Sequence, residues 1–291
     1  MTPANRPRLR AWAMAALAVL TGAALSACGS SDDTTLLERV EGHQLRMAVF
    51  AGPPQAFQNP DGSWTGYDVD ILMGFAETLN ATPEFIALPF DATLEAVQSK
   101  RADVSMGIYW NEGRANAMDF SRPMGNFVDG VAVRGSDPLV GSASFEGLDG
   151  KKVGVIAGTI YVDQAEGIPG VEVVKFSGEP DLLGALKQGR VDAALNSSVA
   201  ISTWAGSAAN DVALLGPAPL QDPPAPELVR GYFAVAKGTY SQTFLEKLNV
   251  YLKDISCDGT LETIMARYDV TDSSFFDGIC EASDVPGLAK P

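Results

Sequence analysis

Leu45-Arg46-Met47-Ala48-Val49-Phe50 opens the stretch of the chain that decides the fold. This short β-type run is followed by a helical pattern over 69–79, a β-type run over 84–88, a helical pattern over 92–99 and a third β-type run over 103–108. Regular alternation of short strands with helices is typical of an α/β architecture with a largely parallel sheet. The sequence therefore predicts an α/β lobe that begins at Leu45.

A second series of the same kind follows. It predicts strands over 128–133, 153–156, 171–176 and 191–195 and a helix over 180–188, which begins at Pro180 and ends before Gly189. A Pro-rich loop over 217–226 then leads to a strand over 231–235 and two closing helices over 241–254 and 260–268. Two series of strands and helices, with a final strand that returns late in the chain, predict two lobes joined by more than one crossing. Open α/β sheets bind ligands at the carboxyl ends of their strands, so we expect a site in the cleft between the lobes.

The beginning of the chain has the pattern of a lipoprotein signal peptide. Arg6, Arg8 and Arg10 precede an apolar run over 11–25, which is short for a membrane span and closes with Leu25-Ser26-Ala27-Cys28. The pattern predicts a signal peptide over 1–27, a lipidated Cys28 and a polar, flexible tether over 28–44. The alternative is an ordinary cleaved signal with a chance cysteine. We expect an extracytoplasmic protein that the lipid on Cys28 anchors to the cell membrane.

Charge and hydropathy narrow the range of partners. The 291 residues carry a formal charge of −15, and loss of a signal that holds three arginines and no acid changes it to −18. An acidic surface argues against nucleic acid or anionic lipid as a partner, although it also serves solubility alone. No apolar run beyond the signal is long enough to span a bilayer, so we expect membrane contact through the lipid anchor only.

Cysteine and histidine usage restricts the possible chemistry. Lipidation uses one of the three cysteines, and Cys257 and Cys280 remain as a pair in an oxidising compartment. The pair predicts a disulfide worth roughly 3 kcal/mol, the alternative being two unpaired thiols. His43 is the single histidine, which argues against Ser-His or Cys-His catalysis and a Cys/His zinc site. Only carboxylate chemistry would remain for an enzyme, and we expect no metal and no cofactor. Asp68 and Asp70 are interpreted as acids at the positive end of a helix, where they cap it, rather than as metal ligands.

Seven motifs occur in order along the mature chain. They are Leu45-Arg46-Met47-Ala48-Val49 with Pro53-Pro54; Gly62 with Gly66-Tyr67-Asp68-Val69-Asp70; Phe90-Asp91 with Ala102-Asp103-Val104; Arg114 with Asp119-Phe120-Ser121-Arg122-Pro123; Lys151-Lys152-Val153-Gly154-Val155 with Ala157-Gly158-Thr159; Gly189-Arg190-Val191-Asp192-Ala193; and Asp258-Gly259-Thr260. In this series the chain resembles the bacterial extracellular solute-binding proteins of family 3, which have the type II periplasmic-binding-protein fold and supply ABC importers for polar amino acids.

The resemblance implies an organisation and a role. Lobe one would comprise 45–126 and 231–291, and lobe two would comprise 127–230. Each lobe would be a mostly parallel sheet flanked by helices, and two hinge crossings would join the lobes. The protein would be a monomer that captures a small-molecule ligand by hinge closure and delivers it to an ABC permease and its ATPase, with no bond made or broken. It would not be an enzyme.

Arg114 is the residue that the resemblance marks most clearly. In the family the arginine six residues before the Phe of the Asp-Phe-Ser element binds the ligand's carboxylate, and a guanidinium is suited to this because it presents a planar pair of donors and stays charged when desolvated. Asn111 is placed to cap the following helix, whose positive end would favour an anion. The alternative is a surface arginine paired with Glu112 or Asp119.

Three positions depart from the family pattern. Tyr109 stands where a Ser or Thr is usual, Ile160 replaces a hydroxyl residue after Gly158-Thr159, and Ser197 replaces the lobe-two acid that pairs with the ligand's ammonium. Because an uncompensated buried ammonium costs several kcal/mol, such a site is not expected to prefer a zwitterion unless another carboxylate substitutes.

Aromatic residues gather at the same positions. Phe50, Phe90, Tyr109 and Trp110 favour an apolar or aromatic ligand with one anionic group, because Arg114 would repel a cationic one. Neighbouring strand residues face opposite sides, so only one of Tyr109 and Trp110 is expected to enter the cleft, and core packing is the alternative for each ring. The full predicted ligand set is Phe50, Phe90, Gly107, Tyr109, Trp110, Arg114, Thr159, Ile160, Asn196 and Ser197.

The leading hypothesis is therefore a lipid-anchored substrate-binding component of an ABC importer for a small amino-acid-like or other carboxylate-bearing solute. A ligand-binding sensor that signals to a partner is the second hypothesis. A cyclohexadienyl-dehydratase-like enzyme on the same fold is the third, and it would require a cleft carboxylate with a raised pKa, which none of the site motifs supplies.

Overall fold

The computed structural model describes residues 34–138, 140, 145–207, 211–215 and 230–282. The predicted signal peptide, Cys28 and the loop over 217–226 lie outside these residues. Within the described ranges, no helix combines the length and the apolar character that crossing a bilayer would require.

Lobe one is built on a parallel sheet of three strands in the order β4-β1-β5. The strands are β1 (Gln44–Val49), β4 (Thr82–Ala87) and β5 (Val104–Ser105), and they alternate with α2 (Tyr67–Thr78) and α3 (Phe90–Gln98). A hairpin of β2 (Phe57–Gln58) and β3 (Trp64–Thr65) precedes α2. The predicted α/β alternation is confirmed in this lobe.

Two small antiparallel sheets complete lobe one. β14 (Arg230–Tyr232) lies between β6 (Ile108–Tyr109) and β8 (Gly125–Asn126), and β7 (Met118–Phe120) pairs with β15 (Ala234–Ala236). The chain leaves lobe one after β8 and has returned to it at β14. Pairing of β8 with β14 therefore places the two crossings side by side.

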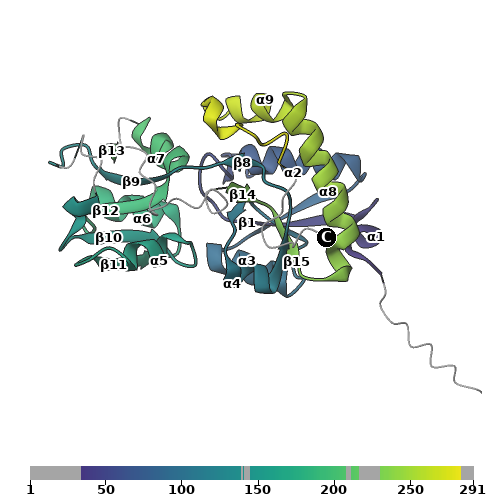
Figure 1. The fold of residues 1–291 in the computed structure, drawn as a ribbon, viewed down its shortest axis with the longest axis horizontal. Helices are drawn as coiled ribbons and strands as arrows, with labels where there is room; N and C mark the ends of the chain where they lie inside the picture. Colours follow the sequence, from purple (N-terminus) through teal and green to yellow (C-terminus); the bar gives the residue numbers. More distant parts are fainter. Residues whose placement is uncertain (1–33, 139, 141–144, 208–210, 216–229, 283–291) are drawn as a thin grey trace, which may run out of the picture. The chain divides into compact units, whose positions relative to one another are not determined.

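Lobe two contains a five-stranded sheet in the order β11-β10-β12-β9-β13. β10 (Lys152–Ile156) is parallel to β11 (Glu172–Phe176) and β12 (Ala193–Ser197). β9 (Asp129–Arg134) is antiparallel to both of its neighbours, β12 and β13 (Val212–Leu215). A short 3₁₀ helix, η1 (Phe145–Leu148), precedes β10, and α5 (Tyr161–Glu166), α6 (Glu179–Lys187) and α7 (Ser198–Ala205) lie against the sheet (Figure 1). Gly189, at φ +70°, follows α6 as predicted.

The C-terminal helices return to lobe one. α8 (Thr239–Cys257) and α9 (Thr260–Ala266) are followed by the 3₁₀ helix η3 (Ser273–Phe275). The predicted disulfide between Cys257 and Cys280 is present, and it joins the end of α8 to the segment after η3. Arg122 also holds that segment, since its Nη2 donates to the carbonyls of Ile279 and Cys280.

The prediction of a flexible tether through residue 44 was wrong at its end. Residues 36–40 form α1 (Leu36–Val40), which is capped by Thr35 and contacts α8. Leu36 and Val40 are fully buried, so their apolar side chains join the core of lobe one. This helix was not predicted because it follows the polar segment 29–35 and has only two buried positions, too few to show a helical period.

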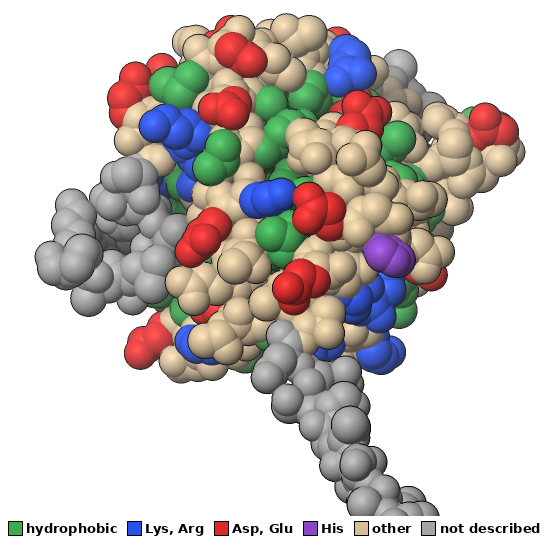
Figure 2. Space-filling model, turned by 90° about the vertical axis from the view of Figure 1, so that its right-hand side faces the viewer, with side chains coloured by type: hydrophobic (Ala, Val, Ile, Leu, Met, Phe, Trp, Pro, Cys, Tyr) green, Lys and Arg blue, Asp and Glu red, His purple; other side chains and the backbone are tan. Residues whose placement is uncertain are grey.

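His43 lies immediately before β1 and is exposed. Its Nδ1 is 2.8 Å from the carbonyl oxygen of Glu41, and the histidine, purple in Figure 2, lies on a face that carries both acidic and basic side chains. In the part of the chain that the structure describes, no group of three or more His, Cys, Asp or Glu residues is placed to hold a metal.

Candidate functional site

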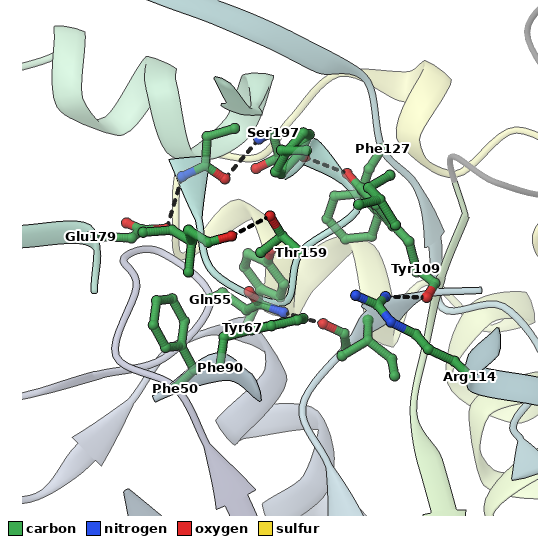
Figure 3. A pocket seen from close by; sticks show the side chains of 17 residues that line it. Phe50, Gln55, Tyr67, Phe90, Tyr109, Arg114, Phe127, Thr159, Glu179 and Ser197 are labelled. Atoms are coloured by element: carbon green, nitrogen blue, oxygen red, sulfur yellow. Dashed lines mark hydrogen bonds between the residues drawn. The ribbon is translucent and has the colours of Figure 1, made fainter. Parts of the chain in front are cut away.

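A pocket lies between the two lobes (Figure 3). Nine of the ten predicted ligand-set residues line it, and Trp110 is the exception. Eight further residues also line it: Gln55, Tyr67, Ile108, Phe127, Ile156, Tyr161, Glu179 and Gly231. The strands and helix ends that supply these residues come from both lobes, as expected for a site in an α/β cleft.

Arg114 reaches the pocket from α4 (Glu112–Ala117). Its Nη1 donates to the carbonyl of Tyr109, and its Nη2 donates to the carbonyl of Gly158 in the other lobe at 2.9 Å. The side chain is buried, and burial lowers the pKa of the guanidinium to about 10, so Arg114 still carries its charge at neutral pH. No carboxylate of the described residues forms an ion pair with it, and the alternative pairing with Glu112 or Asp119 is not observed.

The local fold fixes the position of this arginine. Asn111 caps α4 as predicted, because its Oδ1 accepts a hydrogen bond from the backbone N–H of Arg114 at 2.8 Å. The guanidinium carbon lies 5.3 Å from the centre of the Phe90 ring, which Phe50 contacts edge-on at 5.9 Å between ring centres. Two neutral carbonyls and an aromatic face therefore hold a cation whose charge remains available to an anion.

Strand alternation separates Tyr109 from Trp110 as expected. Tyr109 lines the pocket, with its ring 5.8 Å from that of Phe127 and 6.3 Å from that of Tyr161. Trp110, which directly follows β6, does not line the pocket and packs against the buried cluster that contains Leu94 and Ile108. The prediction that places Trp110 among the ligand-set residues is therefore not supported by its position.

Lobe two contributes the turn after β10. Gly158 adopts φ +78°, and a Cβ atom at this position would lie 2.9 Å from the Cβ of Asp91 in lobe one. A glycine is therefore required both by the backbone conformation and by the close approach of the lobes. Thr159 and Ile160 line the pocket, but the Thr159 hydroxyl donates to the carbonyl of Ile156 at 2.7 Å.

Asn196 and Ser197 line the pocket from the end of β12. The Ser197 hydroxyl accepts a hydrogen bond from the backbone N–H of Ala200 and so caps α7. Asn196 Oδ1 accepts from the backbone N–H of Ser197, while its Nδ2 donates to Glu179 Oε1 at 3.0 Å. The side chains of Asn196 and Ser197 thus form hydrogen bonds within lobe two, and the partner of Asn196 is the carboxylate of Glu179.

Glu179 is the functional candidate that sequence reasoning missed. It is the first residue of α6, it is buried, and its carboxylate faces the pocket across from Arg114 (Figure 3). Burial raises the pKa of this carboxyl to about 7, against the opposing effect of the hydrogen bonds from Asn196 and Trp204. The available signal was an acid just after a predicted parallel strand, at the edge where such sheets bind ligands.

Asp68 and Asp70 lie in the first turn of α2, at its positive end as predicted, but neither caps the helix. The N-cap of α2 is Gly66, which forms no side-chain capping bond. Asp68 Oδ2 instead accepts from the backbone N–H of Gly107 at 2.7 Å and from Gln55 Nε2 at 2.6 Å, and burial raises the pKa of Asp68 to about 7. Asp70 accepts from the Tyr268 hydroxyl at 2.7 Å. Asp68 therefore positions the pocket wall at Gly107 and Gln55.

A second network of polar side chains includes the hydroxyl of Tyr109. The Tyr161 hydroxyl donates to Asp129 Oδ1 at 3.0 Å and lies 3.4 Å from the Tyr109 hydroxyl in the other lobe. Gln164 Nε2 donates to Asp129 Oδ2 at 3.2 Å. Burial raises the pKa of Asp129, which begins β9 next to the first crossing.

Comparison with known proteins agrees with this fold. The model of the bacterial extracellular solute-binding proteins, family 3, matches residues 45–271. The L-cystine-binding protein TcyJ of Escherichia coli (strain K12) is 27% identical over 266 residues, which cover 89% of this chain and 96% of that protein.

Two solved structures share the fold. An ancestral arginine-binding protein bound to arginine is 27% identical, with a TM-score of 0.69, and covers 79% of this chain and 99% of its own. The ancestral amino-acid-binding protein AncCDT-1, a precursor of cyclohexadienyl dehydratase, is 24% identical, with a TM-score of 0.68, and covers 78% and 95%. The type II periplasmic-binding-protein fold and the family match together show that this chain belongs to the bacterial extracellular solute-binding proteins of family 3.

Proposed function

We propose that this protein is the substrate-binding component of an ABC importer and that it captures a small, carboxylate-bearing solute in the pocket between its lobes. The observation that carries the proposal is Arg114, a buried cation at the pocket that has no ion-pair partner among the described residues. A buried charge without a partner costs free energy, and a ligand carboxylate would remove that cost through two parallel hydrogen bonds.

The contacts between the lobes support capture by closure. The Arg114 guanidinium in lobe one donates to the Gly158 carbonyl in lobe two, and the pocket wall comes from both lobes. A ligand that touches both lobes favours the closed arrangement by the contacts it makes only there. The predicted lobe boundaries, 126/127 and 230/231, lie at the paired strands β8 and β14, where hinge motion would occur.

Substitution of Arg114 tests the proposal. Calorimetry with a panel of amino acids and other small carboxylates is expected to identify a ligand for the native protein. Arg114→Ala should weaken its binding by about a hundredfold or more, because a buried charge-assisted contact is lost, and Arg114→Lys should recover part of it. Arg190→Ala removes an exposed arginine and should bind as the native protein does. Equal affinity in Arg114→Ala and the native protein would show that the site is assigned wrongly.

The lipid anchor and the cellular location are part of the same proposal. We infer that Cys28 is lipidated and holds the protein outside the cell membrane near its permease, from the pattern Leu25-Ser26-Ala27-Cys28. The disulfide between Cys257 and Cys280 agrees with an oxidising compartment. Expressed in a lipoprotein-processing bacterium, Cys28→Ser should shift the protein from the membrane fraction to the soluble fraction. An unchanged distribution would refute the anchor.

One observation favours a second candidate function, an elimination reaction. Glu179 supplies the cleft carboxyl with a raised pKa that a general acid requires, and Arg114 would hold the substrate's carboxylate. The acid would donate its proton to a leaving hydroxyl as a cyclohexadienol such as prephenate loses water and carbon dioxide. Formation of phenylpyruvate from prephenate by the native protein, and its loss in Glu179→Gln, would establish this activity. Absence of phenylpyruvate formation would rule out this second candidate.

A further inference from the structure

Glu179 brings a negative charge to the pocket without a matching positive one. Its carboxylate accepts from two neutral donors, Asn196 Nδ2 at 3.0 Å and Trp204 Nε1 at 3.4 Å. No lysine, arginine or histidine of the described chain forms an ion pair with it. When ionised, this buried carboxylate therefore lacks the compensation that buried charges ordinarily require.

The structure makes room for this carboxylate across the cleft. A Cβ atom on Gly52 of lobe one would lie 2.7 Å from Glu179 Oε1 and 2.9 Å from Cδ, closer than atoms can approach. Gly52 is not among the glycines at positive φ, so its backbone conformation does not call for glycine. The missing side chain at residue 52 provides the space into which Glu179 extends from lobe two.

We propose that the Glu179 carboxylate binds a protonated amine of the ligand, so that the solute held at Arg114 carries both a carboxylate and an ammonium group. This inference rests on the proposed function, because it assigns the opposite end of the same ligand. The sequence offers Ser197 where the family has its ammonium-binding acid, and Ser197 is engaged in capping α7. Glu179 supplies the charge from a different element, the start of α6.

The two charged groups belong to opposite lobes, and this gives the assignment a structural consequence. Arg114 extends from α4 of lobe one and Glu179 from α6 of lobe two, on opposite sides of the pocket (Figure 3). A ligand with both charges would connect the lobes through two charge-assisted contacts. A ligand with only a carboxylate would leave Glu179 uncompensated in the closed protein, so the amine is the group that discriminates between solutes.

Paired ligands test the assignment. In calorimetry at neutral pH, each common amino acid and cystine is compared with the carboxylic acid of the same carbon skeleton that lacks the amine. The native protein is expected to bind at least one amino acid about tenfold or more tightly than its amine-free partner. Glu179→Gln should reduce that preference at least about tenfold, mainly by weakening the amino acid, since a buried ion pair loses one partner.

Two control variants and a second test variant distinguish loss of amine recognition from a general effect on the structure. Asp181→Asn removes an exposed carboxylate from the same turn of α6 and should leave the preference unchanged. Gly52→Ala keeps Glu179 but places a Cβ against its carboxylate, and it should also reduce the preference. Gly184→Ala, a substitution in α6 with open space around the new methyl group, is its matched control.

Failure of the Glu179 assignment and failure of the proposed function would give different results. An unchanged preference in Glu179→Gln, or in Gly52→Ala if the first variant does not fold, would overturn the assignment. Native protein that binds amine-free acids as tightly as amino acids would also overturn it while leaving the proposed function intact. Binding of neither member of any pair would contradict the proposed function itself.

Discussion

Glu179 and Asp68 are both buried carboxyls whose pKa burial raises to about 7, and they are held by different partners. Asp68 accepts from the Gly107 N–H and from Gln55, so it positions the wall of lobe one. Glu179 accepts from Asn196 and Trp204 and faces the pocket itself. A similarly raised pKa thus accompanies a positioning role for Asp68 and a proposed ligand contact for Glu179.

The raised pKa of Glu179 predicts a pH dependence of stability. The unfolded carboxyl releases its proton near 4.5 and the folded one near 7, so the folded state binds more protons in between and its free energy of unfolding falls as pH rises through this window. Glu179→Gln lacks this titration. From about pH 5 to about pH 8, the stability of the variant relative to the native protein should rise by about 2 kcal/mol.

Urea denaturation of both proteins at the two pH values, without ligand, measures this difference. Glu262→Gln, in the exposed first turn of α9, is the control and should give a much smaller change. A stability difference between Glu179→Gln and the native protein that is the same at both pH values would show that Glu179 is not the titrating group.

Residue-level prediction succeeded where a local rule applied. The family motif selected Arg114, which lines the pocket, Asn111 was recognised as a helix cap, and strand alternation predicted that Tyr109 but not Trp110 would enter the cleft. Glu179 could not be assigned in the same way. Its significance depends on the start of α6 meeting Gly52 of the other lobe, and sequence spacing holds no information on that contact.

At the scale of elements, the long helices and the buried strands followed the predicted pattern, whereas short elements did not. The predicted strand over 103–108 divides into β5 and β6 because the N–H and carbonyl of Gly107 bond to Asp68 and Gln55. The hairpin of β2 and β3 and the five-residue α1 are too short to produce a recognisable hydrophobic period. Tertiary packing decides such elements.

The α1 helix gives a prediction at this scale. Leu36→Ala removes a fully buried side chain of α1 that packs in the core of lobe one and should cost about 2 to 4 kcal/mol of stability. Val250→Ala on α8, where the valine is 61% exposed, should cost less than about 0.5 kcal/mol. Chemical denaturation measures both. A flexible tether at 36–40 would instead make Leu36→Ala as harmless as Val250→Ala.

On the scale of the whole molecule, the pocket exists only where the two lobes meet. The Gly158 turn approaches Asp91, the Arg114 guanidinium bonds to the Gly158 carbonyl, and Glu179 extends toward Gly52. Each contact joins lobe one to lobe two, and β8 and β14 set the two crossings side by side. The two-lobed fold was predicted from strand and helix alternation together with the family motifs. The pairing of residues across the cleft required the structure.

Capture of a carboxylate-bearing solute on Arg114 can be tested by mass spectrometry of the small molecules released on denaturation, from native protein and from Arg114→Ala purified in parallel. We expect a carboxylate-bearing metabolite in near-stoichiometric amount from the native protein and its loss from the variant. The same metabolite in equal amount from both proteins, or a native ligand without a carboxylate, would contradict it.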